Sequence, residues 1–230
     1  MARQLDEQIA ARFPVGRRLR VLDVGMGRGT QALRLARAGH EVTGVERDAD
    51  GLAAARAAAA AEPEGIRSRM RIVEGDGRDT GVHFLPGSFD VVLCHGVLMY
   101  VEEPDAVLAG LGRVLAPGGL LSLVVRNADA LAMAPGLRGD WAGALAAFGT
   151  DTYGDGRGGE ARAHRLDAVT GALAGIAAPL RAWYGVRVFG DAVPGDAAGV
   201  EALLAAEGRA GRTDPYRTVA SLLHVCGGRD

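Results

Sequence analysis

Apolar and polar residues follow strand-like and helix-like periods along the first half of the chain. Five short apolar runs are typical of strands buried on both faces of a parallel sheet, at 19–24, 40–45, 70–73, 89–94 and 120–125. The segments between them have apolar residues at helical spacing or a high helix propensity, over 30–37, 50–61 and 104–115. A further helix over 2–13 precedes the first strand. This alternation predicts a doubly wound α/β sheet.

The second half of the chain is less regular but supplies the elements that would complete the sheet. A short helix, a turn and a second helix are expected over 131–148, with Trp141 and Phe148 on their apolar side. The remaining elements are helices over 166–180 and 200–207 and strands over 183–189 and 218–226. Two final strands, with Pro215 just before the last, suit a closing hairpin-like pair. We therefore expect a seven-stranded, Rossmann-like sheet whose last strand is antiparallel.

The chain length favours one domain over residues 1–230. Residues 127–182 interrupt the strand and helix pattern and are expected to form a helical and loop insertion. Within this insertion, residues 149–160 (GTDTYGDGRGGE) are rich in glycine and aspartate. Such a segment predicts a flexible loop, which is either a lid over a ligand site or an ordinary surface loop.

Composition restricts the classes of function only moderately. The net charge of −2 and the pI near 6.2 do not indicate a nucleic-acid-binding protein as a whole, although a local basic patch is compatible with them. The two cysteines, Cys94 and Cys226, lie inside apolar runs and are expected to be buried thiols, with no disulfide and no metal site. No signal peptide or long uncharged apolar segment is visible, so we expect a cytoplasmic, soluble protein that does not bind a membrane.

The stretch LRVLDVGMGRGTQALRLAR, residues 19–37, predicts a strand, a tight glycine loop and a helix. Gly25, Gly27 and Gly29 would let a ligand approach the backbone, and the helix N-terminus offers free N–H groups. The dinucleotide fingerprint G-x-G-x-x-G/A fails because its last position would be Thr30. Asp23 would repel a pyrophosphate but can accept hydrogen bonds from the cationic methionine end of S-adenosylmethionine. The alternative is a glycine-rich turn without a ligand.

Three more polar residues follow predicted strands, whose carboxyl ends face the ligand crevice of such sheets. Glu46 lies about 20 residues after the first loop glycine, where an acidic residue can bind ribose hydroxyls; the other interpretation is a helix cap. Asp76 would face an adenine amino group or belong to a polar turn. His95 would contact a cofactor or substrate, or have a structural role. The agreement of these positions favours a binding site at one edge of the sheet.

These residues resemble known sequence motifs. D-x-G-x-G-x-G, at residues 23–29, is similar to motif I of class I S-adenosylmethionine-dependent methyltransferases. More narrowly, the chain resembles the family that methylates 5-carboxymethoxyuridine in tRNA (CmoM-type enzymes). The similar stretches are LRVLDVGMGRGT, RAGHEVTGVE, HGVLMYVEEPDAVL, VLAPGGLLSL, RNADAL, GVRVFGD and DPYRTVASLLHV. The specific ones are RNADAL, GVRVF and the late DPY with its terminal HV strand, because many methyltransferases share the first half.

The resemblance implies S-adenosyl-L-methionine as the cofactor and assigns expected contacts to it. The loop from Gly25 through Met26 to Gly27 would lie against the methionine moiety, and Glu46 would bind the ribose. The other implied contacts are Gly77 and Arg78 around the adenine, His95 on the cofactor, and Arg3 on the methionine carboxylate. The insertion at 127–182 would then lie over the acceptor site, where the molecule that receives the methyl group binds.

The acceptor determines what further chemistry the site needs. A carboxylate is ionised at neutral pH and needs only positioning groups, for which Arg126, Asn127, Arg187 and Tyr216 are the candidates. A hydroxyl or an amine would need a base, for which His95 and His224 are the candidates.

Three functions therefore stay open. The chain could methylate a tRNA carboxylate, methylate a small molecule of specialised metabolism, or bind S-adenosylmethionine without catalysis. Two departures from the tRNA family weaken the first: a longer N-terminal extension is missing, and residues 149–160 replace a basic segment. A compensating basic patch would consist of Arg157, Arg162, His164, Arg165, Arg209, Arg212 and Arg217.

Overall fold

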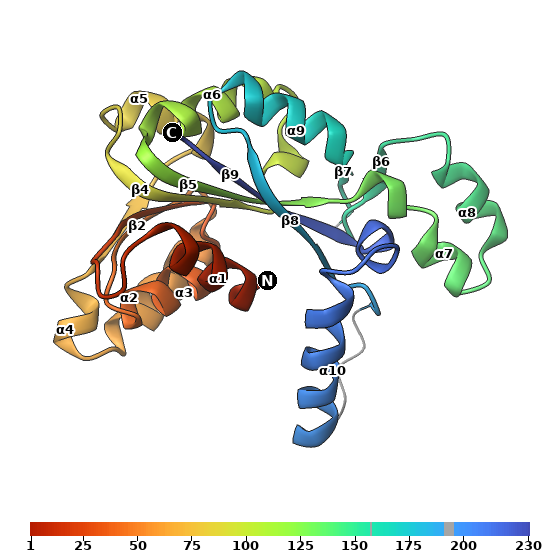
Figure 1. Ribbon diagram of the computed structural model, residues 1–230, viewed down its shortest axis with the longest axis horizontal. Helices are drawn as coiled ribbons and strands as arrows, with labels where there is room; N and C mark the ends of the chain where they lie inside the picture. Colours follow the sequence, from red (N-terminus) through yellow and green to blue (C-terminus); the bar gives the residue numbers. More distant parts are fainter. Residues whose placement is uncertain (157, 191–195) are drawn as a thin grey trace.

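The computed structural model describes residues 1–156, 158–190 and 196–230 and contains a seven-stranded mixed sheet (Figure 1). The strand order is β3-β2-β1-β4-β5-β9-β8. The strands are β1 (Arg20–Val24), β2 (Glu41–Glu46), β3 (Met70–Glu74), β4 (Phe89–His95), β5 (Leu115–Arg126), β8 (Leu180–Val186) and β9 (Leu222–Gly228). The first five strands are parallel, and β9 is antiparallel to both β5 and β8. The predicted doubly wound sheet with an antiparallel last strand is confirmed.

Helices cover both faces of the sheet (Figure 1). One face carries α1 (Ala2–Arg12), α2 (Thr30–Arg37), α3 (Ala49–Ala60) and α4 (Glu64–Arg67). The other carries α5 (Thr80–His83), α6 (Pro104–Val114) and α9 (Leu166–Gly175). Beyond the carboxyl end of β5 lie α7 (Met133–Leu137), α8 (Trp141–Ala147) and the strand pair β6 (Thr152–Gly154) and β7 (Glu160–Arg162), while α10 (Ala197–Ala210) projects from the sheet.

The central strands are apolar on both sides because both faces are covered. Val92 of β4 belongs to the cluster that packs under α6 and α9, whereas Leu93 belongs to the cluster that packs under α1 and α2. Cys94 and Cys226 are buried free thiols, in agreement with the expectation from their apolar surroundings. Among the described residues, no helix combines the length and apolar character needed to cross a bilayer.

Several boundaries in the second half differ from those expected. Helix α9 ends at Gly175, not at residue 180, because Ala177 has a φ of 55° and Pro179 disfavours helical geometry in the residue before it. Strand β8 therefore begins earlier and ends at Val186. Residues 216–219 form a 3₁₀ helix, so β9 begins only at Leu222. The expected loop at 149–160 contains β6 and the start of β7, which pair antiparallel; Arg157 lies outside the described residues.

The expected apolar side of residues 131–148 is not buried, which corrects that prediction. Trp141 and Phe148 are 71% and 77% exposed. The helix instead turns small side chains inward: Ala144 lies near Gly136 of α7, and Ala147 packs on the small cluster of Ala128, Leu131 and Ala163. The large side chains of α8 therefore face solvent.

This orientation predicts the effect of substitutions on stability. Trp141→Gln and Phe148→Gln should each change the free energy of unfolding by less than about 0.5 kcal/mol, because these side chains already face water. Leu173→Ala, in the fully buried part of α9, should cost about 2–5 kcal/mol. Urea unfolding followed by circular dichroism measures all three. A loss for Trp141→Gln as large as that for Leu173→Ala would contradict the exposed position.

Candidate functional site

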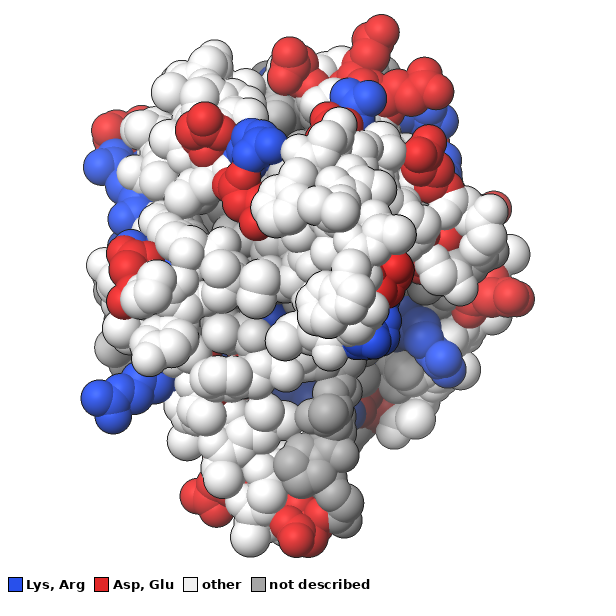
Figure 2. Space-filling view, turned by 90° about the vertical axis from the view of Figure 1, so that its right-hand side faces the viewer, with Lys and Arg blue, Asp and Glu red and all other residues white. Residues whose placement is uncertain are grey.

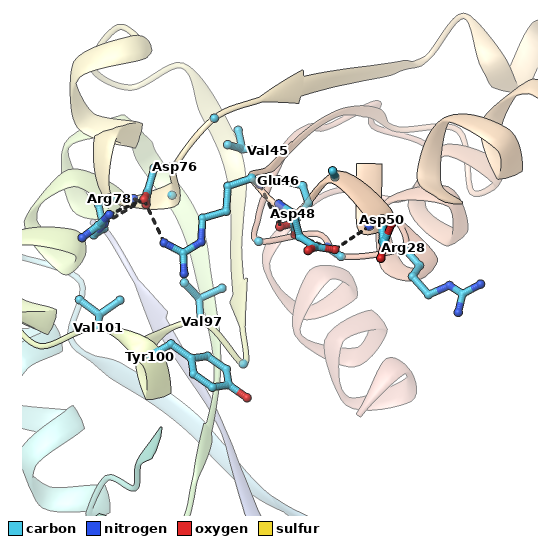
Figure 3. Close-up of a pocket in the computed structure, with 18 of the residues that line it drawn as sticks. Arg28, Val45, Glu46, Asp48, Asp50, Asp76, Arg78, Val97, Tyr100 and Val101 are labelled. Carbon is cyan, nitrogen blue, oxygen red and sulfur yellow. Dashed lines mark hydrogen bonds and ion pairs between the residues drawn. The ribbon is translucent and has the colours of Figure 1, made fainter. Parts of the chain in front are cut away.

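A cavity of about 880 Å³ lies at the carboxyl ends of four adjacent strands (Figure 3). Its wall is built from the segments that follow β1, β2, β3 and β4, which converge because parallel strands end at the same edge. Of the residues predicted to bind a cofactor, those that line it are Gly25, Gly27, Glu46, Asp76, Gly77 and Arg78. The structure therefore brings together six residues that are up to 53 positions apart in the sequence (25 to 78).

The glycine loop after β1 requires glycine for two separate reasons. Gly25 has a φ of 67°, and a Cβ placed on it would overlap Cγ2 of Val97 on the facing wall of the cavity. Gly27 has a φ of 55°, but a Cβ there would meet nothing within 4 Å. A side chain at Gly25 would therefore displace a cavity residue, whereas one at Gly27 would meet only the backbone penalty of the left-handed region.

Glu46, at the end of β2, holds the loop in place. One carboxylate oxygen accepts a hydrogen bond from the Gly27 N–H at 2.7 Å, and the other accepts from the N–H groups of Arg47 and Asp48, each at 2.9 Å. Asp48 in turn caps α3 by accepting from the Gly51 N–H at 2.7 Å. The side chain of Glu46 therefore connects β1, β2 and α3 at the rim of the cavity. Of the two interpretations of Glu46, the helix cap is not borne out at α3, whose N-cap is Asp48, and the ribose contact stays a prediction.

Asp76, after β3, is held by two arginines (Figure 3). Its carboxylate accepts hydrogen bonds from Nε and Nη2 of Arg78 at 3.0 and 2.7 Å and from Nη1 of Arg47 at 3.3 Å. The hydrogen bonds from the Arg78 guanidinium lower the pKa of Asp76 to about 2. Arg47 was not expected from the sequence. Its only signal was its position directly after Glu46 at a strand end.

Asp23 lies beneath the cavity and does not line it. Its side chain is 3% exposed, and burial raises its pKa to about 7 against the effect of a hydrogen bond from the Ala32 backbone. Ala32 is in the first turn of α2, whose N-cap residue, Gly29, makes no side-chain cap. The Asp23 carboxyl therefore lies close to the first turn of this helix.

Besides Asp23, three more of the expected cofactor residues lie outside the lining of the cavity. Met26 points into the core, where a Cβ on Gly44 would overlap its sulfur. Arg3 is exposed on α1. His95 ends β4 directly before Gly96, a lining residue, and burial lowers its pKa to about 4, so it is neutral at pH 7. The contacts predicted for these side chains stay predictions.

The residues expected to position an acceptor gather around one segment but do not line the cavity. Asn127 is 1% exposed; its amide N–H groups donate to the carbonyls of Thr218 and Ala220, both at 2.9 Å, so it holds the end of β5 against this segment. Tyr216 lies on the same segment and is 53% exposed. Arg187 is exposed, just beyond β8, and its carbonyl accepts from the Ser221 N–H at 3.2 Å.

A second group lies where the cavity meets the insertion. Tyr100 lines the cavity after β4. Arg126, the last residue of β5, stacks over the ring of Tyr153 with 5.2 Å between the guanidinium carbon and the ring centre. The Tyr153 hydroxyl donates to the sulfur of Met99 at 2.8 Å. The buried Nε of Arg126 has no hydrogen-bond partner among the described residues. Tyr153 was missed because residues 149–160 were expected to be a flexible loop.

The sequence and the fold were compared with known proteins. A family described as "Methyltransferase domain" matches residues 22–123. The chain is 39% identical over 129 residues to the tRNA 5-carboxymethoxyuridine methyltransferase of Escherichia coli K12, a match that covers 56% of this chain and 48% of the relative. It is 36% identical over 117 residues to a ubiquinone biosynthesis O-methyltransferase of Pectobacterium carotovorum, covering 50% of this chain and 47% of the relative. The chain thus spans about half the length of these relatives.

The fold has similar solved structures over its whole length. An S-adenosylmethionine-dependent methyltransferase from Mesorhizobium loti superposes with a TM-score of 0.63 and 19% sequence identity. The match covers 97% of this chain and 96% of the other. At this identity the likeness concerns the fold alone.

The burial of Asp23 predicts a pH dependence of stability. Between the ordinary pKa of 3.8 and the folded value near 7, the folded chain holds a proton that the unfolded chain has released. The free energy of unfolding should therefore fall as pH rises from about 4 to 7 and level off above it, by at most ~4 kcal/mol at about 1.4 kcal/mol per pKa unit.

Asp23→Asn cannot titrate at this position and keeps an oxygen for the Ala32 N–H, so it should lack this part of the pH dependence. Urea unfolding of both proteins at several pH values between 4 and 8 measures the difference. Parallel curves for the two proteins would show that Asp23 is not protonated in the folded chain.

Proposed function

We propose that this chain, whose residues 22–123 match a family described as "Methyltransferase domain", is a class I methyltransferase that transfers a methyl group from S-adenosylmethionine to an acceptor molecule. The observation that carries the proposal is the cavity, in which the glycine loop, Glu46 and Asp76 meet at one edge of the sheet. The similarity to methyltransferases of tRNA and of ubiquinone biosynthesis supports it. A cytoplasmic location belongs to the same proposal.

The residues present fit the nucleoside part of this cofactor. Glu46 and Asp76 are carboxylates on adjacent strands, able to accept hydrogen bonds from ribose hydroxyls and from the adenine amino group. Val97 and Val101 give the cavity an apolar wall for the base. Gly25 leaves room for the side chain of Val97, which forms part of this wall. A dinucleotide fits less well, because Thr30 stands where the G-x-G-x-x-G/A fingerprint requires glycine or alanine.

The chemistry requires alignment more than acid or base catalysis. The sulfonium of the cofactor supplies an activated methyl group, so the protein must hold the acceptor atom in line with it. Tyr100 and the Arg126–Tyr153 pair lie at the carboxyl ends of β4 and β5, next to the cavity. We assign the acceptor to this region. The guanidinium of Arg126 is suited to a carboxylate, with Arg187 and Tyr216 as further positioning candidates, whereas the buried amide of Asn127 is used by backbone groups of the adjoining segment.

The first candidate acceptor is the carboxylate of 5-carboxymethoxyuridine in tRNA, which the relative from Escherichia coli supports. The second is a small molecule, which the surface charge favours. In Figure 2, uncharged side chains cover much of the described face that carries α7, α8 and α10, with acidic and basic groups interspersed. Most arginines of the expected basic patch face acidic partners: Arg162 with Asp151, Arg165 with Asp129, Arg212 with Glu7 and Arg217 with Asp214.

The cofactor assignment is tested by one pair of variants. Glu46→Ala should weaken binding of S-adenosylhomocysteine by about 1–3 kcal/mol, because hydrogen bonds to a charged group are lost and the loop is released. Glu74→Ala is the matched control. Glu74 pairs with Glu46 in the register of β2 and β3, but it is exposed and does not line the cavity. Calorimetry measures both affinities. Equal affinities for both variants and the wild type would remove Glu46 from the binding site, and NAD binding without S-adenosylhomocysteine binding would overturn the proposal.

The acceptor is tested by turnover on an anticodon stem-loop that carries 5-carboxymethoxyuridine. Methyl transfer should require the carboxylate, so the same stem-loop with unmodified uridine is the control. The apparent affinity should fall as the salt concentration rises, because phosphate contacts release counterions. Arg126→Lys should lower turnover while leaving S-adenosylhomocysteine affinity unchanged, since Lys lacks the planar fork. Turnover on a small carboxylic acid or phenol, with none on the stem-loop, would select the second candidate.

A further inference from the structure

A chain of buried polar side chains crosses three strands of the sheet beneath α1. It starts at His95, whose Nε2 lies 2.9 Å from Oγ of Ser122 on β5. Ser122 Oγ lies 2.8 Å from Nε2 of His224 on β9, and His224 Nδ1 lies 3.0 Å from Oε1 of Gln4 on α1. Gln4, Ser122 and His224 are at most 4% exposed. None of these three residues lines the cavity, but His95 directly precedes the lining residue Gly96.

The direction of each hydrogen bond in this chain follows from its far end. The amide nitrogen of Gln4 donates to the Gly185 carbonyl at 3.3 Å, so the amide oxygen faces His224 and must accept. Nδ1 of His224 therefore carries the proton. Burial lowers the pKa of His224 well below its ordinary value, so the ring is neutral and its Nε2 is an acceptor.

The same logic continues to His95. Because Nε2 of His224 accepts, the hydroxyl of Ser122 donates to it, and a weaker contact from Cys226 Sγ lies at 3.4 Å. The oxygen of Ser122 is then left to accept from His95, so Nε2 of His95 carries the proton. Nδ1 of His95 consequently carries no proton and can only accept a hydrogen bond. This atom is shielded from solvent and has no hydrogen-bond partner among the described residues.

We propose that Gln4, His224 and Ser122 are positioning residues that hold His95 with Nδ1 as an acceptor for a hydrogen-bond donor of the bound ligand. The inference rests on the proposed function for the identity of that ligand. The matching chemistry is an N–H or O–H group, either the ammonium at the amino-acid end of the cofactor or a hydroxyl of the acceptor molecule. A carboxylate does not fit, because Nδ1 has no proton to donate. A buried acceptor without a partner is unfavourable, so a ligand donor that meets it is bound more tightly.

The tautomers are tested directly by nitrogen NMR of the imidazole rings in the wild-type chain. His95 should be protonated at Nε2 and bare at Nδ1, and His224 should show the opposite pattern. Signals are assigned by their loss in His95→Asn and His224→Asn. In Ser122→Ala, which interrupts the series of hydrogen bonds between Gln4 and His95, His95 should become a mixture of both tautomers. A wild-type His95 protonated at Nδ1 would overturn the proposal. This readout needs neither cofactor nor activity, so it separates the proposal from the proposed function.

Binding and turnover then identify the donor. If the ammonium is the donor, Ser122→Ala should weaken S-adenosylhomocysteine about tenfold, Ser122→Thr should recover most of this loss, and an analogue lacking the α-amino group should bind both proteins equally. If a hydroxyl of the molecule that receives the methyl group is the hydrogen-bond donor to His95, Ser122→Ala should lower kcat with unchanged S-adenosylhomocysteine affinity.

Controls keep the result interpretable. Ser221→Ala removes a hydroxyl that does not belong to the series of hydrogen bonds between Gln4 and His95, and this variant should behave as the wild type. If Ser122→Ala does not fold, Gln4→Met removes the acceptor at the other end, and Gln4→Glu restores it. Folded variants that leave tautomers, affinity and kcat unchanged would overturn the positioning role.

Discussion

The hydrogen bond from the Gly27 N–H to the Glu46 carboxylate joins two segments of the cavity rim. It fixes the glycine loop against the end of β2, while the second carboxylate oxygen orders the two residues that lead into α3. The loop can take this position only because Gly25 and Gly27 adopt left-handed backbone geometry and Gly25 leaves room for Val97. The glycine loop at the rim of the cavity and the lead into α3 are therefore held by one side chain. A ligand that bonds to Glu46 would meet a carboxylate already held in place.

Beneath this rim, buried polar groups perform structural tasks that an apolar core cannot. Asp23 lies close to the first turn of α2, and Asn127 holds the end of β5 to the segment before β9. The chain from Gln4 to His95 connects α1 with the end of β4. Each of these groups is nearly fully buried or shielded, so its partners determine its proton or its orientation. In the site we propose, these buried groups set the geometry and the exposed groups meet the ligands.

The insertion after β5 forms a surface with exposed apolar side chains. Helices α7 and α8 leave large apolar side chains exposed, and the β6–β7 pair brings Tyr153 against Arg126. The charge of this region bears on the choice between the two candidate methyl acceptors. A basic surface would favour an anionic polymer, but four arginines of the expected basic patch face carboxylates. The distribution of charge therefore gives the small-molecule acceptor its support, while sequence similarity supports the tRNA acceptor.

The sequence alone determined the succession of strands and helices along the first half of the chain and the edge of the sheet at which the site lies, because strand and helix periods and the glycine spacing are local. It also indicated Glu46 and Asp76, since each follows an apolar strand. It could not show that Met26 turns into the core, that the amide of Asn127 is used by backbone carbonyls, or that Trp141 faces solvent. Those outcomes depend on which neighbour packs against each side chain. The chain from Gln4 to His95 joins residues from four distant segments, and only the tertiary structure brings their donors and acceptors into register.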